Sequence, residues 1–199
     1  FSNEALLNRI NSDLANDLGN LVSRTVAMID KYFGGVIPEE RAVGEFDADL
    51  KKLLGETPGR VEELMDKLQF STALAEIWKV ISRTNKYIDE TMPWVLAKDE
   101  ASKPRLAEVM YNLAESLRIT SILIQPFMPE TPEKIWQQLG LADKAALSWE
   151  SAEKWGGYPK GTAVCKGDVI FPRIDVKKEL EELEALTGQT VEKAAEVKA

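Results

Sequence analysis

Trp94 directly follows Pro93, and among the residues of this chain this pair points most clearly to a binding site. Pro93 is expected to end a helix, because its ring clashes with the preceding turn and it has no N–H to donate. It also disfavours helical geometry at Met92, so Trp94 is expected at a helix end. An aromatic face open to solvent can stack on a nucleic-acid base, which contributes about 1–3 kcal/mol per base. The alternative is that Trp94 only closes the core at the helix junction, since most Trp side chains are largely buried.

Asn20 and Arg24 form a second polar pair with a spacing that suits base recognition. Residues four apart share a helix face, and these two flank an apolar stripe. Asn has both a donor and an acceptor for the edge of a base, and Arg has a planar fork for a base or phosphate. A solvated helix edge without a ligand is the alternative.

Three lysines could add contacts to an RNA backbone. Lys31 lies on the same helical line as Arg24, while Lys86 and Lys98 lie on either side of Trp94 in the sequence. Basic groups around an aromatic face are typical of sites that bind single-stranded RNA.

Histidine is absent, and Cys165 is the single cysteine. The chain therefore lacks the commonest general base, the commonest zinc ligand and every nucleophile pair that needs histidine. No glycine-rich phosphate-binding loop occurs either. We predict no catalytic residues and no metal site in this chain, and the lone cysteine suits a cytoplasmic, reducing compartment.

The composition sets further limits on partners. The net charge of −8 argues against indiscriminate polyanion binding, although a local basic edge could still meet RNA. No run of 18 apolar residues occurs, so we expect no membrane partner. The chain starts at Phe1 without a signal-like segment or an initiator Met, and we expect it to be a piece of a longer protein.

Apolar residues recur at steps of three and four, which predicts helices. Residues 38–58 instead hold several helix breakers around a short amphipathic piece. The expected helices span about residues 3–33, 59–91 with a bend near Gln69, 104–124 and 133–139.

We therefore predict an all-α fold, an antiparallel bundle of about five helices over residues 1–140. Residues 141–175 are rich in Gly and Pro and should form an irregular arm, with 163–171 as a short strand or extended segment. Residues 176–199 contain mostly Lys, Glu, Leu and Ala, which predicts a charged helical linker or tail.

Four blocks of the sequence together resemble the anticodon-binding domain of bacterial methionyl-tRNA synthetases, which are class I enzymes. The resemblance covers residues 1 to about 176. Its blocks are 13–24 with 31–38, then Asn85–Ile88 with Pro93-Trp94 and Ala97-Lys98, then 126–129 with 134–140, and finally Ile170–Asp175.

This resemblance implies a helical bundle that follows a catalytic domain and reads the CAU anticodon of methionine-accepting tRNA. It implies that Asn20 and Arg24 contact anticodon bases, that Trp94 stacks on the first base and that Pro93 shapes the turn. The motifs that activate methionine are absent here, so ATP, and in some members zinc, would bind in a separate catalytic domain. Residues 141–175 would pack on the bundle or on that domain, and the tail resembles a linker to an appended tRNA-binding domain.

Two alternatives stay open at this point. The synthetases for valine, isoleucine, leucine and cysteine have a related bundle, although the pairing of Pro93-Trp94 with Asn20 and Arg24 favours methionine. A helical scaffold that does not bind RNA would show no anticodon preference.

Overall fold

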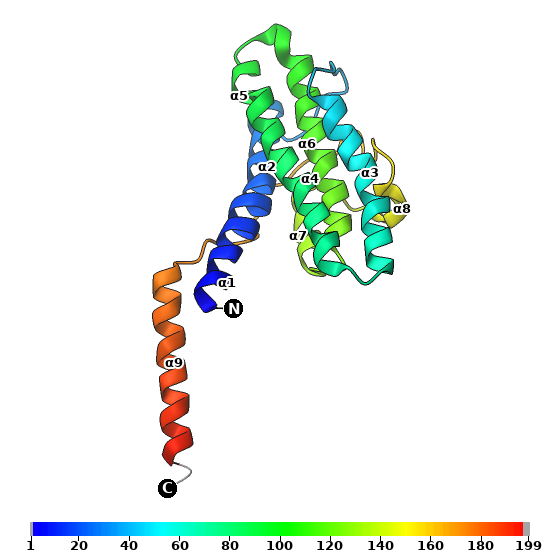
Figure 1. Ribbon diagram of the computed structural model, residues 1–199. Coiled ribbons are helices and arrows are strands. Elements are labelled where there is room, and N and C mark those ends of the chain that lie inside the picture. The colour runs from blue at the N-terminus through cyan, green and yellow to red at the C-terminus, as the bar shows by residue number, and fades with distance from the viewer. Residues whose placement is uncertain (1, 197–199) are drawn as a thin grey trace.

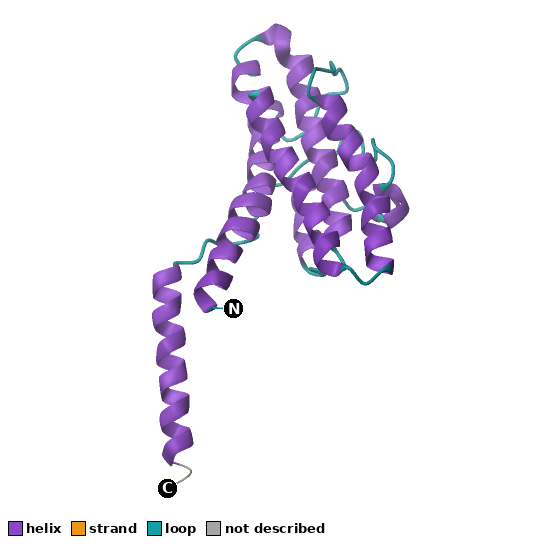
Figure 2. Cartoon of the chain, in the orientation of Figure 1, coloured by secondary structure: helices purple, strands orange, loops and turns teal. Residues whose placement is uncertain are grey.

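The computed structural model describes residues 2–196, and it describes the side chains of residues 2–186. This part of the chain consists of helices and loops, with one isolated β-bridge and no strand (Figures 1 and 2). The α-helices are α1 (Asn3–Arg9), α2 (Asn20–Phe33), α3 (Asp47–Asp66), α4 (Phe70–Thr91), α5 (Pro93–Leu96), α6 (Lys103–Ile124), α7 (Thr131–Leu139), α8 (Trp149–Ala152) and α9 (Val176–Glu196).

The first predicted helix is confirmed as a continuous rod. The segment η1 (Ile10–Gly19) joins α1 to α2 with wider, π-helical turns that the sequence pattern did not reveal. Ser2 caps the start by accepting a hydrogen bond from the Ala5 N–H at 3.2 Å. Gly34 ends the rod in a left-handed conformation with φ of 62°, which glycine adopts without a steric penalty.

The single helix predicted over 59–91 is wrong, because α3 and α4 are two antiparallel helices side by side (Figure 1). The chain reverses just before the expected bend, where Leu68 takes a left-handed φ of 58°. The helix breakers in residues 38–58 predicted that the long helix would start only after Pro58. Helix α3 instead starts at Asp47 and contains Pro58. Leu50, Leu54 and Val61 bury one face of α3 completely. Burial of several such side chains offsets a proline cost of about 3 kcal/mol.

Helix α6 is the centre of the core. Every residue from Leu106 to Ile124 is buried, and α2, α3, α4 and α7 contact this helix. A helix that is enclosed on all sides must either be apolar all round or pair its polar groups internally. These five helices confirm the predicted all-α bundle.

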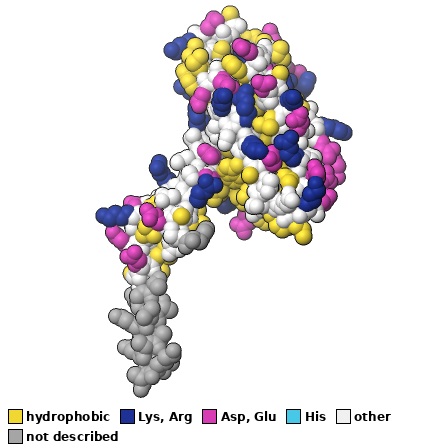
Figure 3. Space-filling view, viewed as in Figure 1, with side chains coloured by type: hydrophobic (Ala, Val, Ile, Leu, Met, Phe, Trp, Pro, Cys, Tyr) yellow, Lys and Arg dark blue, Asp and Glu magenta, His cyan; other side chains and the backbone are white. Residues whose placement is uncertain are grey.

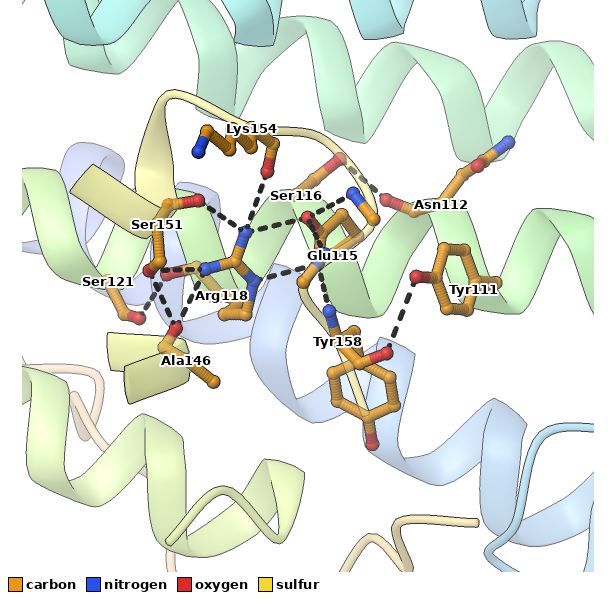
Figure 4. A network of polar contacts seen from close by, with 12 residues as sticks. Tyr111, Asn112, Glu115, Ser116, Arg118, Ser121, Ala146, Ser151, Lys154 and Tyr158 are labelled. Carbon is orange, nitrogen blue, oxygen red and sulfur yellow. Dashed lines mark hydrogen bonds and ion pairs between the residues drawn. The ribbon is translucent and has the colours of Figure 1, made fainter. Parts of the chain in front are cut away.

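Residues 144–158 cover one side of α6 and are attached to it by a buried ion pair (Figure 4). Arg118 and Glu115 are both fully buried, with 2.7 Å between Nη2 and Oε1. Glu115 accepts the backbone N–H groups of Gly156, Gly157 and Tyr158 at 2.7–2.9 Å. Arg118 donates to the carbonyl oxygens of Ala146, Ser151 and Lys154. The pair therefore fixes a segment whose regular structure consists of two short helical pieces, Lys144–Leu147 and α8.

The rest of the arm follows an extended path beside the first rod. Of the two forms predicted for 163–171, the structure has the extended segment, with one antiparallel bridge between Val36 and Ala163 in place of a strand. Asn11 then exchanges two hydrogen bonds of 2.8 Å with the backbone of Ile174. Helix α9 follows, lies against α1 and projects away from the bundle (Figure 1). Among the described residues, none of the helices has the length and apolar character to cross a membrane.

Candidate nucleic-acid interface

A tight turn at Met92 presents Trp94 at the end of α4. Met92 takes a left-handed conformation with φ of 43°, which costs a non-glycine residue about 1–2 kcal/mol. The turn is held because the Met92 N–H donates to Ile88 O at 3.0 Å and the Val95 N–H donates to Met92 O at 2.8 Å. Pro93 is buried at the first position of α5, whereas Trp94 is 44% exposed. This exposure does not fit a Trp that only closes the core.

A buried polar cluster on α3, α4 and α6 fixes the last turns of α4 below this aromatic residue. The Tyr87 hydroxyl donates to Asp47 Oδ1 at 2.6 Å and accepts from Asn112 Nδ2 at 2.9 Å. Arg105 donates to both oxygens of Asp47, at 2.8 and 2.9 Å. The exposed turn therefore starts from a rigid position.

The cluster also shifts two pKa values. Burial alone would raise the pKa of Asp47, but hydrogen bonds from Arg105, Tyr87 and the Gly44 N–H outweigh it, so this pKa lies below its usual value. Burial, together with the bond to ionised Asp47, raises the pKa of the Tyr87 hydroxyl. Asp47 is therefore charged and Tyr87 neutral at neutral pH.

Arg24 lies beside the last turns of α4, next to Asp89, which precedes Pro93 by only a few residues in the sequence. Its Nη2 atom is 3.8 Å from Asp89 Oδ1, and its side chain is 35% exposed. Asn85 of α4 donates to the carbonyl oxygen of Asp17 at 3.3 Å, and this bond joins α4 to the η1 segment of the same rod. Asn20 is exposed at the start of α2. The structure thus joins the helix of Arg24 to α4, which ends just before the turn that leads to Trp94.

Acidic neighbours are the part of this surface that sequence reasoning missed. Asp89 is 70% exposed next to Arg24, and Glu90 lies 3.4 Å from Lys86 Nζ. Glu90 also accepts from Arg83 at 2.9 Å. A signal was present, because Glu90 stands four residues after Lys86 on a predicted helix. Lys86 is therefore already paired in this structure.

The other two lysines are exposed at different places. Lys31 lies near the end of α2, with its Nζ 5.5 Å from the centre of the Tyr32 ring. Lys98 lies just after α5, four residues beyond Trp94. Lys98 thus follows the aromatic residue closely, whereas Lys31 is seven residues along α2 from Arg24.

The end of the molecule around α5 has an apolar surface with charged groups beside it. Met92, Trp94 and Val95 are each 44–45% exposed. Figure 3 shows hydrophobic side chains near α5 with Lys and Arg side chains close by. Such a surface can stack on a flat ring and donate hydrogen bonds to its edge. Among the described residues, no group of three or more His, Cys, Asp or Glu could hold a metal ion.

Comparison with known families and proteins identifies relatives of this domain. The family described as the anticodon binding domain of methionyl tRNA ligase matches residues 37–190. The methionine–tRNA ligase of Caldanaerobacter subterraneus subsp. tengcongensis is 60% identical over 198 residues, which is 100% of this chain and 31% of that protein. The ligase of Bacillus subtilis is 52% identical over 181 residues, 90% of this chain and 27% of that protein.

The fold is also shared with a solved structure. The apo form of Mycobacterium tuberculosis methionyl-tRNA synthetase aligns with a TM-score of 0.81 and 36% identity, over 88% of this chain and 35% of that chain. The chain spans about a third of the length of the relatives it matches. The family match over more than half of the residues, the high identities and the shared bundle agree, and the chain belongs to the anticodon-binding domain family of the methionyl-tRNA ligases.

Proposed function

We propose that this domain reads the CAU anticodon of methionine-accepting tRNA and that Trp94 is the stacking platform for the first anticodon base. The observation that supports this most is the 44% exposure of Trp94 directly after buried Pro93. A large aromatic side chain held open by a turn in a costly conformation suits a ligand with a flat ring.

Asn20 and Arg24 are proposed to supply the hydrogen bonds that distinguish one base from another. Arg24 is already oriented toward α4 by Asp89, so its guanidinium is placed near the turn before RNA arrives. A site that uses buried or oriented polar groups rejects ligands that cannot pair with them. Lys98, Lys86 and Lys31 are proposed to contact phosphates, and Lys86 would have to leave Glu90 to do so.

The chemistry of aminoacylation is proposed to lie outside these 199 residues, where ATP and methionine would bind. The Caldanaerobacter ligase has more than twice this length beyond the shared domain, and this chain has no histidine. A catalytic domain in the same polypeptide is the proposed protein partner, and the cytoplasm is the proposed compartment.

Binding of anticodon stem-loops to this chain tests the proposal. We expect a stem-loop with CAU to bind at least tenfold more tightly in a filter assay than the same stem with a scrambled loop. Loops that carry valine, isoleucine, leucine or cysteine anticodons serve as a second set of competitors. Equal affinity for CAU and scrambled loops would contradict anticodon reading, and preference for one of the competitors would reassign the domain.

A further inference from the structure

The segment between α4 and α6 carries Trp94, and one carboxylate ties the two ends of this segment together. Tyr87, one turn before the end of α4, donates its hydroxyl hydrogen to Asp47 Oδ1 at 2.6 Å. Arg105, in the first turn of α6, donates from Nη2 to the same oxygen at 2.8 Å. Residues 88–104 are therefore closed at their base by Asp47 of α3. We call this contact of three side chains the Asp47 bridge.

The Asp47 bridge is shielded from water and has a fixed direction. Asp47 and Tyr87 are both buried, and hydrogen bonds in such surroundings are stronger than at the surface. Arg105 also donates from Nη1 to Asp47 Oδ2 at 2.9 Å, so its planar fork meets both carboxylate oxygens. Paired contacts of this kind fix the orientation of the two groups as well as their distance. The ends of the segment are therefore held in one relative position.

Backbone contacts carry this constraint from the Asp47 bridge to the turn. The Thr91 hydroxyl donates to the carbonyl oxygen of Tyr87 at 2.7 Å, and Met92 follows Thr91 directly. On the other side of the turn, α5, which contains Trp94, contacts α6. Figure 1 shows α5 and the chain that leads into α6 at the same end of the bundle. Trp94 is thus supported by α4 from one side and by α6 from the other.

One buried atom beside the Asp47 bridge indicates a role other than stability alone. Asn112 donates from Nδ2 to the Tyr87 hydroxyl at 2.9 Å, but its buried Oδ1 has no hydrogen-bond partner among the described residues. A buried acceptor without a partner costs about 1–3 kcal/mol. Apolar side chains of similar volume often stabilise a core at least as well as a polar cluster does. A cluster that bears this cost suits a function in fixing one conformation.

We propose that the Asp47 bridge positions the anticodon platform. It holds residues 88–104 in the conformation in which Trp94 can stack on a base, and it acts through Trp94 and not by contact with RNA. This inference rests on the proposed function, in which Trp94 is the stacking platform. A loop that must be ordered when a ligand arrives lowers the affinity, and a platform that is already fixed avoids this loss.

Tyr87→Phe tests the proposal, because it removes the hydroxyl and leaves the ring in the core. Tyr158→Phe is the matched control, since Tyr158 is also buried and its hydroxyl donates to the carbonyl oxygen of Leu139 at 2.9 Å. Amide exchange is measured in the full-length ligase without RNA, at the hydrogen-bonded N–H groups of residues 92–98. We expect Tyr87→Phe to increase this exchange about tenfold and the control to change it less than about twofold.

Stem-loop binding to the same variants shows whether the effect passes through Trp94. Tyr87→Phe should weaken binding of the CAU stem-loop about fivefold or more. In the Trp94→Ala background the same change should alter binding less than about twofold, because a residue that acts through Trp94 loses its influence when the ring is gone. Arg105→Lys keeps the charge but loses the planar fork, so it cuts the Asp47 bridge at α6 and should give the same pattern.

Three results would overturn the proposal. Unchanged exchange in residues 92–98 of folded Tyr87→Phe and Arg105→Lys would show that the segment keeps its conformation without the Asp47 bridge. An equal rise of exchange in α7 would show a general loss of stability. An equal loss of binding with and without Trp94 would show that the bridge does not act through the platform.

Failure of the anticodon proposal would have a different signature. Equal affinity of the parent for CAU and scrambled loops, or no effect of Trp94→Ala, would refute that proposal. The exchange measurement needs no RNA, so it would still decide whether the Asp47 bridge holds the segment that carries Trp94.

Discussion

Glu115→Gln is expected to lower the free energy of unfolding by about 3–5 kcal/mol. Glu115 is fully buried, receives both guanidinium contacts of Arg118 and accepts three backbone N–H groups (Figure 4). The amide keeps the size of the side chain but removes the charge and replaces one acceptor oxygen with an NH2 group that faces other donors. Arg118 would then be a buried cation without its partner, which is the costly case. With a urea slope of about 2 kcal/mol per M, the unfolding midpoint should fall by about 2 M.

Urea unfolding followed by circular dichroism measures this change. Glu153→Gln is the matched control, because Glu153 is an exposed residue of the same covering segment. We expect that control to stay within about 0.5 kcal/mol of the parent. A loss below about 1 kcal/mol for Glu115→Gln, with an unchanged slope, would refute the view that the pair holds residues 144–158 on α6.

Three further results are expected. Because the pKa of Asp47 is lower in the folded state, ionised Asp47 stabilises the fold at pH values above its usual pKa of 3.8, and this contribution is lost as the pH falls through the folded pKa. In urea unfolding measured from pH 7 to pH 3, the stability of Asp47→Asn should therefore depend less on pH than that of the parent. Gly157→Ala places a Cβ 2.6 Å from the Arg118 Cζ atom and should lower the stability of the fold by about 1–3 kcal/mol. A Cβ at Gly55, which lies inside a helix, meets nothing within 4 Å, so Gly55→Ala should raise the stability by up to about 1 kcal/mol. Thermal unfolding of both variants checks these two values. Arg24→Ala should reduce the ratio of CAU to non-CAU stem-loop affinity while changing stability by less than about 0.5 kcal/mol, and an unchanged ratio would place base reading elsewhere.

Local steric rules were enough to predict several features from the sequence. Pro93 had to end a helix because of its own ring, and Gly34 had to follow one, so both boundaries were found. The apolar stripe of α6 was recognised too. Its polar members were not interpreted, although Glu115 and Arg118 stand three residues apart on that helix.

The features that were missed depend on tertiary contacts. The left-handed Leu68 carries no sequence signal comparable to glycine, so the reversal between α3 and α4 was taken as a bend. Pro58 was taken as a breaker because its cost is local, while the burial that offsets it comes from distant residues. The contact between Arg24 and Asp89 joins positions 65 residues apart, and only the packed bundle brings them together.

Trp94→Ala, compared with Val95→Ala, tests the central claim most directly. The two side chains are neighbours with nearly equal exposure, 44% and 45%, but only Trp94 offers a ring for a base. Loss of one stacking contact of about 1–3 kcal/mol should weaken binding of the CAU stem-loop by about 5- to 140-fold, while Val95→Ala should change it less than twofold. Circular dichroism of each variant shows whether the fold is intact. Unchanged affinity in a folded Trp94→Ala variant would contradict the proposed role of this residue in reading the anticodon.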